Sequence, residues 1–133
     1  MPESQKVLAK VLLVDDDSLV LKSVAGVIEN AGFAVETASR GKEAIEKFTS
    51  SPPNVMVIDA IMPEMNGFEV MRKIRTNEAW KKIPIIVLTG LKAPDDATLA
   101  RSAGASDVLV KPVDGATIVK RIKYHLFEKQ KQL

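Results

Sequence analysis

The stretch Val11-Leu12-Leu13-Val14-Asp15-Asp16-Asp17 places three acidic residues directly behind an uninterrupted apolar run. A second run, Val55-Met56-Val57-Ile58, ends at a single carboxylate, Asp59. Short continuous apolar runs are typical of strands that are buried on both faces of a parallel sheet. Parallel strands bring their carboxyl ends to one edge, and ligands bind at that edge in open α/β folds. The two runs therefore predict a cluster of carboxylates at one edge of a sheet.

Apolar strands and amphipathic helices alternate along the rest of the chain. Besides the two runs above, the pattern predicts strands over 33–38, 83–88 and 107–110. Helical spacing or helix-capping residues follow each strand, over about 18–31, 39–48, 68–80, 94–104 and 114–131. Strands that alternate with single helices imply right-handed crossovers and a parallel sheet with helices on both faces. We therefore expect one α/β domain.

The composition limits the class of protein and the kind of site. The chain has 133 residues, of which 46% are hydrophobic and 27% charged, as in an ordinary globular domain. A formal net charge of +2 is too small to indicate a nucleic-acid or membrane surface. There is no cysteine, so a bound metal must use oxygen ligands or the single histidine, His125. Because no apolar run approaches the roughly 20 residues of a membrane span, and the first residues lack a secretory signal, we expect a cytoplasmic protein.

Five polar side chains are expected at the carboxyl ends of the strands: Asp15, Asp16, Asp59, Thr89 and Lys111. Carboxylates at close range disfavour one another unless a cation compensates them, and Mg²⁺ prefers oxygen ligands. A metal and a lysine together stabilise phosphoryl oxygens during in-line transfer. Asp59 stands alone at its strand end and is the best nucleophile candidate, since carboxylates form acyl phosphates in other enzymes. The set therefore indicates Mg²⁺-dependent phosphoryl chemistry.

Four motifs in this order resemble the receiver domain of two-component response regulators, the CheY-like superfamily. They are Val11–Asp16, Val57–Asp59 leading into Met62–Gly67, Leu88–Gly90 and Val110–Pro112. The likeness covers about residues 9–127. It implies a receiver domain over 9–133 behind a polar extension of residues 1–8. The implied fold is a flavodoxin-like (βα)5 three-layer sandwich with a parallel five-stranded sheet of order 2-1-3-4-5.

The resemblance implies a regulatory phosphoacceptor in a phosphorelay rather than an enzyme. Asp59 would accept a phosphoryl group from a phosphohistidine of a sensor histidine kinase or a histidine phosphotransfer protein. Thr89 would hydrogen-bond the new phosphoryl group, and Lys111 would pair with it after a cis Lys111–Pro112 bond. The implied Mg²⁺ ligands are Asp16, Asp59 and the backbone carbonyl of Ile61, with Asp15 assisting.

The resemblance also implies an output surface, formed by the fourth helix, the last strand and the last helix, that regulates a downstream protein. A phosphorylation-dependent homodimer through this surface is left open. Many receivers carry Tyr or Phe at the position of Val108, where the ring turns inward when the threonine moves. A valine cannot make that rotation, so we expect this surface to respond differently. Ile61 and Leu91 would border the path of hydrolytic water without orienting it, which predicts slow loss of the phosphoryl group.

Two alternative functions would also use the acidic residues or their surface. A haloacid-dehalogenase-like phosphatase would use Asp15 as its nucleophile, but the chain has no residues to spare for a substrate-covering cap. A degenerate receiver would serve only as an interaction module, and the complete set of polar residues disfavours it. Asp17 is expected to cap the first helix. His125 is expected to be a partly exposed residue of the last helix, not a phosphotransfer group.

Overall fold

A computed structural model describes residues 6–90 and 94–129 of the chain. The first elements along the chain are β1 (Lys10–Val14), α1 (Ser18–Asn30), β2 (Ala34–Ala38), α2 (Gly41–Ser50), β3 (Val55–Asp59) and α3 (Gly67–Arg75). After them come the 3₁₀ turn η1 (Glu78–Trp80), β4 (Ile85–Thr89), α4 (Pro94–Ser102), β5 (Asp107–Val110), α5 (Gly115–Lys123) and the π-helical turn η2 (Tyr124–Glu128). Strands and helices alternate as predicted.

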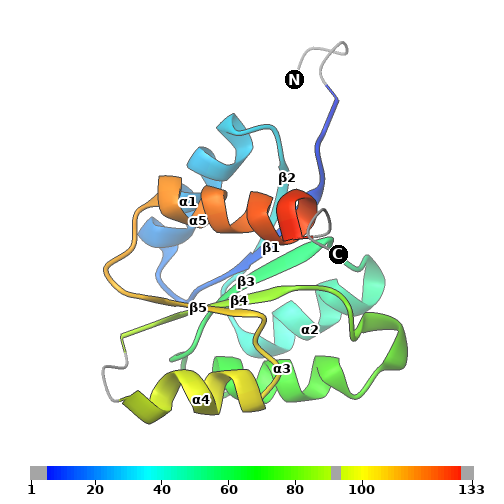
Figure 1. Ribbon diagram of the computed structural model, residues 1–133, viewed down its shortest axis with the longest axis vertical. Helices are drawn as coiled ribbons and strands as arrows, with labels where there is room; N and C mark the ends of the chain where they lie inside the picture. Colours follow the sequence, from blue (N-terminus) through cyan, green and yellow to red (C-terminus); the bar gives the residue numbers. More distant parts are fainter. Residues whose placement is uncertain (1–5, 91–93, 130–133) are drawn as a thin grey trace.

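The five strands form one parallel sheet of order β2-β1-β3-β4-β5. Figure 1 shows α1 and α5 on one face of this sheet and α2, α3 and α4 on the other. The three-layer sandwich and the strand order that the sequence predicted are thus confirmed. None of the helices within 6–90 and 94–129 combines the length and the apolar character needed to cross a membrane.

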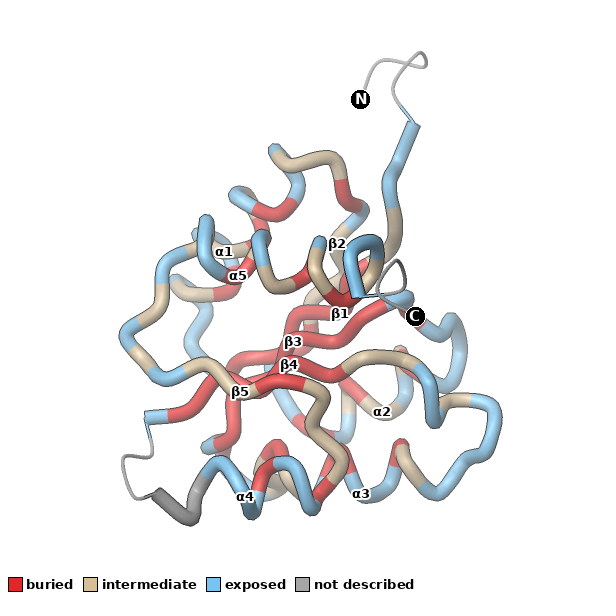
Figure 2. The backbone as a smooth tube through the Cα atoms, in the orientation of Figure 1, coloured by how far each residue is buried: buried red, intermediate tan, exposed pale blue. Residues whose placement is uncertain are grey.

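The central strands contribute side chains to two separate hydrophobic cores, because successive side chains of a strand point to opposite faces of the sheet. One set packs against α2 and α3: Leu12, Val14, Met56, Ile58, Ile85 and Val87. The alternate set packs against α1 and α5: Val11, Leu13, Val55, Val57, Ile86 and Leu88. Figure 2 shows β3 and β4 buried along their length, and β1 is buried from Val11 onward. Burial on both faces is the reason why these strands are continuous apolar runs in the sequence.

The register of the sheet sets the level at which each strand ends. Val14, the last residue of β1, lies opposite Ile58 of β3. Asp15 and Asp59 are the next residues after this pair, so both strands deliver a carboxylate to the same edge. Asp17 then begins the first helix: its carboxylate accepts hydrogen bonds from two backbone amides of α1, at 2.9 and 3.2 Å. The predicted cap at Asp17 is confirmed.

The expectation that His125 is partly exposed is wrong. His125 lies in η2 and is only 7% exposed. Its Nε2 is 2.9 Å from Oδ2 of Asp107. Asp107 is also buried, and the same oxygen accepts a hydrogen bond from Nε of Arg121. Burial alone would raise the pKa of Asp107, but the hydrogen bonds from Arg121 and His125 outweigh it and hold that pKa below its ordinary value. The carboxylate of β5 is therefore the partner that makes a buried histidine tolerable.

Candidate functional site

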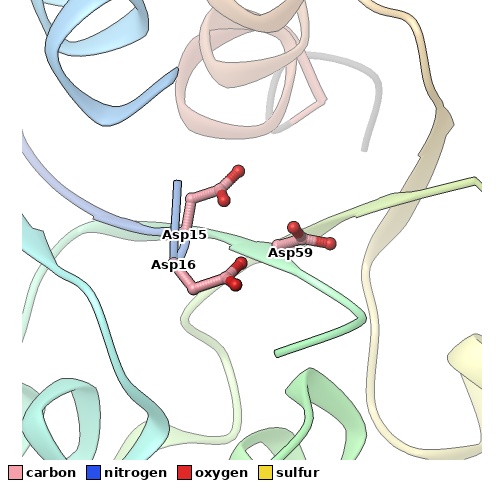
Figure 3. A group of neighbouring side chains, drawn as sticks. All are labelled: Asp15, Asp16 and Asp59. Atoms are coloured by element: carbon pink, nitrogen blue, oxygen red, sulfur yellow. The ribbon is translucent and has the colours of Figure 1, made fainter. Parts of the chain in front are cut away.

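Three carboxylates meet at the carboxyl edge of the sheet. Figure 3 shows them: Asp15 and Asp16 follow β1, and Asp59 ends β3. One oxygen of each lies within 4.8 Å of the others. Asp15 and Asp59 are 1% and 6% exposed, whereas Asp16 faces solvent. The structure therefore brings together the acidic cluster that the sequence predicted.

Backbone amides orient the two buried carboxylates. The N–H of Asp17 donates to Oδ1 of Asp15 at 2.9 Å, and the N–H of Ile61 donates to Oδ1 of Asp59 at 3.1 Å. In both cases the donor lies two residues beyond the carboxylate, so one oxygen is held by the local turn. Oδ2 of Asp15 is buried and receives no hydrogen bond from the described residues. This oxygen is available to a ligand in the cluster.

Lys111 is the cation of the site. Its Nζ lies 2.8 Å from Oδ2 of Asp59 and 3.7 Å from Oδ2 of Asp15. The Lys111–Pro112 bond is cis, as predicted. Partial burial disfavours the charged form, but the hydrogen bond and the charge of Asp59 outweigh it and raise the pKa of Lys111. Lys111 is therefore cationic at neutral pH.

Thr89 occupies the end of β4, next to β3 in the sheet. It is 2% exposed, and its neighbour Leu88 lies opposite Asp59. Its carbonyl accepts a hydrogen bond of 2.7 Å from the backbone N–H of Lys111. The sheet thus holds Thr89 and Lys111 on adjacent strand ends beside the carboxylates.

The remaining predicted positions lie at the rim of the site or beyond it. Ile61 is 62% exposed and lies two residues after Asp59, the last residue of β3. Val108 is half-buried in β5 and lies opposite Val87 of β4. Leu91, the second residue expected beside the path of water, lies outside the described residues.

The residues present fit a hard divalent cation. Three carboxylates face one lysine, so the cluster carries an excess of negative charge. Its donors are oxygens, with one buried oxygen of Asp15 lacking a hydrogen bond from the described chain. Hard cations such as Mg²⁺ take carboxylate, carbonyl and water oxygens. A bound cation would therefore offset the repulsion that the fold creates.

Replacing Asp15 by asparagine is expected to stabilise the metal-free protein at neutral pH. Burial raises the pKa of Asp15, the amide of Asp17 opposes this, and the charge of Asp59 adds to it. The folded state thus holds a proton more tightly than the unfolded chain, so stability falls as the pH rises through the raised pKa. Asparagine removes the charge and keeps an oxygen for the amide of Asp17.

Urea denaturation with and without MgCl₂ measures this effect. The advantage of Asp15→Asn should vanish in acid, below the ordinary carboxyl pKa of about 4, where both proteins are uncharged at this position. Added Mg²⁺ should stabilise the parent protein more than the variant, because the variant has lost a carboxylate ligand. Equal midpoints at neutral pH without Mg²⁺ would contradict the prediction.

Gly67 allows α3 to begin against the end of β3. Its N–H donates to the carbonyl of Ala60 at 2.9 Å. A Cβ at this position would lie 2.5 Å from the carbonyl oxygen of Asp59 and 3.0 Å from Cα of Ala60. Both are backbone atoms, which cannot move away as a flexible side chain can. Glycine is required here by close approach, not by an unusual φ.

Gly67→Ala is expected to lower the free energy of unfolding by about 2 kcal/mol, as overpacking does elsewhere. The matched control is Gly26→Ala in α1, where a Cβ would meet nothing within 4 Å. That change should stabilise the protein by about 0.5–1 kcal/mol, since alanine is the better helix former. Urea denaturation of both variants measures the predicted loss of stability in Gly67→Ala and the predicted gain in Gly26→Ala. A stabilised Gly67→Ala would show that the strand end has room to yield.

A shallow pocket beside Asp16 is formed by residues that the sequence analysis did not assign to the site. Its other walls are Ser39 and Arg40, which precede α2, and Pro63 and Glu64, which precede α3. Glu64 has a φ of 69°, a left-handed conformation that costs a non-glycine residue about 1–2 kcal/mol. Pro63 is a turn signal in the sequence, but no local pattern places the loop after β2 next to Asp16.

The geometry agrees with what sequence comparison finds. The family model of the response regulator receiver domain matches residues 11–123. The transcriptional regulatory protein PrrA of Mycobacterium tuberculosis is 39% identical over 114 residues, which are 86% of this chain and 48% of PrrA. The two-component response regulator ORR11 of Oryza sativa subsp. japonica is 38% identical over 104 residues, covering 77% of this chain and 71% of ORR11. This chain thus spans about half the length of PrrA.

Solved structures share the fold over nearly the whole chain. The chemotaxis protein CheY4 of Vibrio cholerae has a TM-score of 0.85 at 35% identity, covering 90% of this chain and 100% of CheY4. The BeF3-activated DrrB receiver domain has a TM-score of 0.79 at 28% identity, covering 90% of this chain and 98% of that one. With the matched family model and the acidic pocket at the sheet edge, these likenesses place the chain in the response regulator receiver domain family of two-component systems.

Proposed function

We propose that Asp59 is the phosphoacceptor of this receiver domain. A carboxylate oxygen of Asp59 attacks the phosphorus of a phosphohistidine on a sensor histidine kinase or histidine phosphotransfer protein. The new P–O bond forms as the P–N bond breaks, and the imidazole nitrogen keeps the electron pair. The observation that carries the proposal is the contact of 2.8 Å between Lys111 Nζ and Oδ2 of Asp59 inside the acidic cluster. The ammonium group of Lys111 is thus already next to the oxygens that would carry the phosphoryl group, and it can stabilise their negative charge.

Mg²⁺ is the cofactor that we propose for this site. Its ligands would be Asp15, Asp16, Asp59 and the backbone carbonyl of Ile61. When bound, the ion supplies positive charge to the cluster and to the phosphoryl oxygens. Support comes from the buried oxygen of Asp15 that lacks a hydrogen bond from the described residues, and from the all-oxygen donor set.

Lys111 and Thr89 would hold the phosphoryl group once it is transferred. Lys111 would pair with a phosphoryl oxygen in place of its present contact with Oδ2 of Asp59. The hydroxyl of Thr89, at the end of the neighbouring strand, would donate a hydrogen bond to another oxygen. Both roles require side chains at the same level of the sheet, and the 2.7 Å bond from the Lys111 amide to the Thr89 carbonyl provides that alignment.

We also propose a location and an output surface for this domain. One receiver domain over residues 9–133 would act in the cytoplasm and regulate a downstream protein through the surface of α4, β5 and α5. Val108 replaces the usual aromatic residue on that surface, so its response would not use a rotating ring. Slow loss of the phosphoryl group is expected beside apolar Ile61, which offers no side-chain hydrogen bond to orient hydrolytic water.

Mapping the modified residue tests the proposal. The protein is incubated with acetyl phosphate and MgCl₂, the acyl phosphate is reduced with borohydride, and peptides are sequenced by mass spectrometry. We expect modification at Asp59, and none when EDTA replaces MgCl₂. Modification at Asp15 would favour the haloacid-dehalogenase-like phosphatase. An unmodified protein that also fails to bind beryllofluoride would be a degenerate receiver.

A further inference from the structure

A second open pocket lies at the opposite edge of the sheet, where the strands begin. Its walls come from the segments that precede β1, β3, β4 and β5, and from η2. Figure 1 shows η2, at the red end of the colour scale, at this side of the molecule. The pocket has a volume of about 660 Å³, within the range of roughly 300–1,000 Å³ that small-molecule sites occupy. It shares no residue with the acidic cluster.

The pocket combines apolar walls with a cationic rim. The apolar surface includes Leu8 and Phe127, two large side chains that are 50% and 37% exposed. The rim carries Lys81, Lys82 and Lys129. Lys81 is paired with Glu78 at 2.7 Å, whereas Lys82 and Lys129 have no carboxylate partner within the described part of the chain. None of the described residues that line the pocket is acidic. Two uncompensated ammonium groups beside an apolar wall favour an anion with an apolar body.

His125 provides an independent observation. It lines the pocket and is more than nine-tenths buried. Its Nε2 contacts Asp107, but its Nδ1 is buried and has no hydrogen-bond partner among the described residues. Leaving a buried ring nitrogen unpaired is unfavourable, so such groups call for an explanation in a folded protein. The residue also sits in a π-helical turn, a rare element that is frequent at functional sites.

From these observations we propose that this pocket binds a small amphipathic anion, an apolar body that carries a carboxylate, sulfonate or phosphate. The apolar body packs against Leu8 and Phe127. The anionic group lies between Lys82 and Lys129. On binding, a small movement of the His125 ring lets a polar atom of the ligand supply the hydrogen bond that the shielded Nδ1 lacks. The proposal does not depend on phosphoryl transfer to Asp59.

Titration of the full chain with anilinonaphthalene sulfonate, an aromatic anion whose fluorescence rises in apolar surroundings, tests the proposal. We expect saturable binding at one site. The double variant Lys82→Glu/Lys129→Glu should weaken that binding at least about tenfold, which corresponds to about 1.4 kcal/mol. The matched control is Lys120→Glu/Lys123→Glu on α5, which makes the same change in net charge at exposed positions outside the pocket. The control should change the affinity less than about threefold.

Two further measurements distinguish binding in this pocket from nonspecific binding of the probe to apolar surface. Phenylnaphthylamine has a similar aromatic body without the sulfonate and should bind at least about tenfold more weakly. The sulfonate should shift the NMR signals of the His125 ring nitrogens. Equal losses of affinity in the two double variants, equal binding of the neutral probe, or unchanged His125 signals at saturation would each overturn the proposal. Because all four lysines are exposed, amide NMR spectra should show both variants folded.

Discussion

Asp59→Asn is expected to abolish phosphoryl uptake from acetyl phosphate completely, not merely to slow it. The amide has no anionic oxygen to attack phosphorus, and the neighbouring carboxylates, Asp15 and Asp16, are the ones that we assign to Mg²⁺. Asp15 is 1% exposed against 6% for Asp59, and one of its oxygens is held by the amide of Asp17. Intact-mass spectrometry in the presence of MgCl₂ measures the gain of one phosphoryl group. Asparagine retains an oxygen for the amide of Ile61, so the fold should be preserved.

Asp17→Asn is the matched control for this prediction. Asp17 belongs to the same acidic run, but its carboxylate caps α1 and takes no part in the cluster. Asparagine caps helices about as well as aspartate, so both stability and phosphoryl uptake should remain close to those of the parent. Uptake by Asp59→Asn at the parent's rate would remove Asp59 from the role of phosphoacceptor.

Arg75→Ala is expected to cause the largest loss of stability among the changes considered. The guanidinium of Arg75 joins α3 through backbone carbonyls to the nearby segment that follows it and to the distant turn before β5. Nε and Nη2 donate to the carbonyl of Gly104 at 3.0 and 2.9 Å, and Nη1 donates to those of Trp80 and Ile83 at 2.9 and 2.8 Å. Gly104, with φ +116°, also leaves no room for a Cβ, which would lie 2.6 Å from Cγ of Arg75.

We expect the alanine variant to lose about 3 kcal/mol of unfolding free energy, because several partly buried carbonyls lose a charged donor at once. Arg75→Lys should recover only part of this loss, since an ammonium group cannot span the carbonyls that the planar guanidinium joins. Arg72→Ala is the control: Arg72 is exposed on the same helix and makes no hydrogen bond or ion pair within the described chain. Its effect should stay within about 0.5 kcal/mol.

Urea denaturation of the three arginine variants measures these differences. Full rescue by lysine would show that charge alone matters at this position. A loss in Arg75→Ala no larger than that in Arg72→Ala would show that solvent replaces the guanidinium without cost. Either result would contradict the structural role inferred for Arg75.

The order and type of the elements, and the position of the acidic site, follow from the amino-acid pattern alone. Continuous apolar runs predicted buried parallel strands, and Asp15 and Asp59 follow from the ends of two such runs. This inference succeeds because strand burial and helix amphipathicity leave their periods in neighbouring residues. The cap at Asp17 was equally local, since its acceptor and donors lie within one turn.

Which side chains from distant parts of the chain come into contact depends on the folded packing. Arg75 and Gly104 are 29 residues apart in the chain and no sequence pattern linked them. For Lys111 and Asp59, 52 residues apart, the sequence predicted a shared sheet edge but not the direct contact. His125 and Asp107 are separated by 18 residues. Because the sequence did not reveal this contact, His125 was expected to be partly exposed, and that expectation was wrong. No local period records such pairs, because each depends on how helices pack on the sheet and how strands align within it. Sequence patterns specify faces and ends of elements, whereas packing and register decide which side chains share a neighbour.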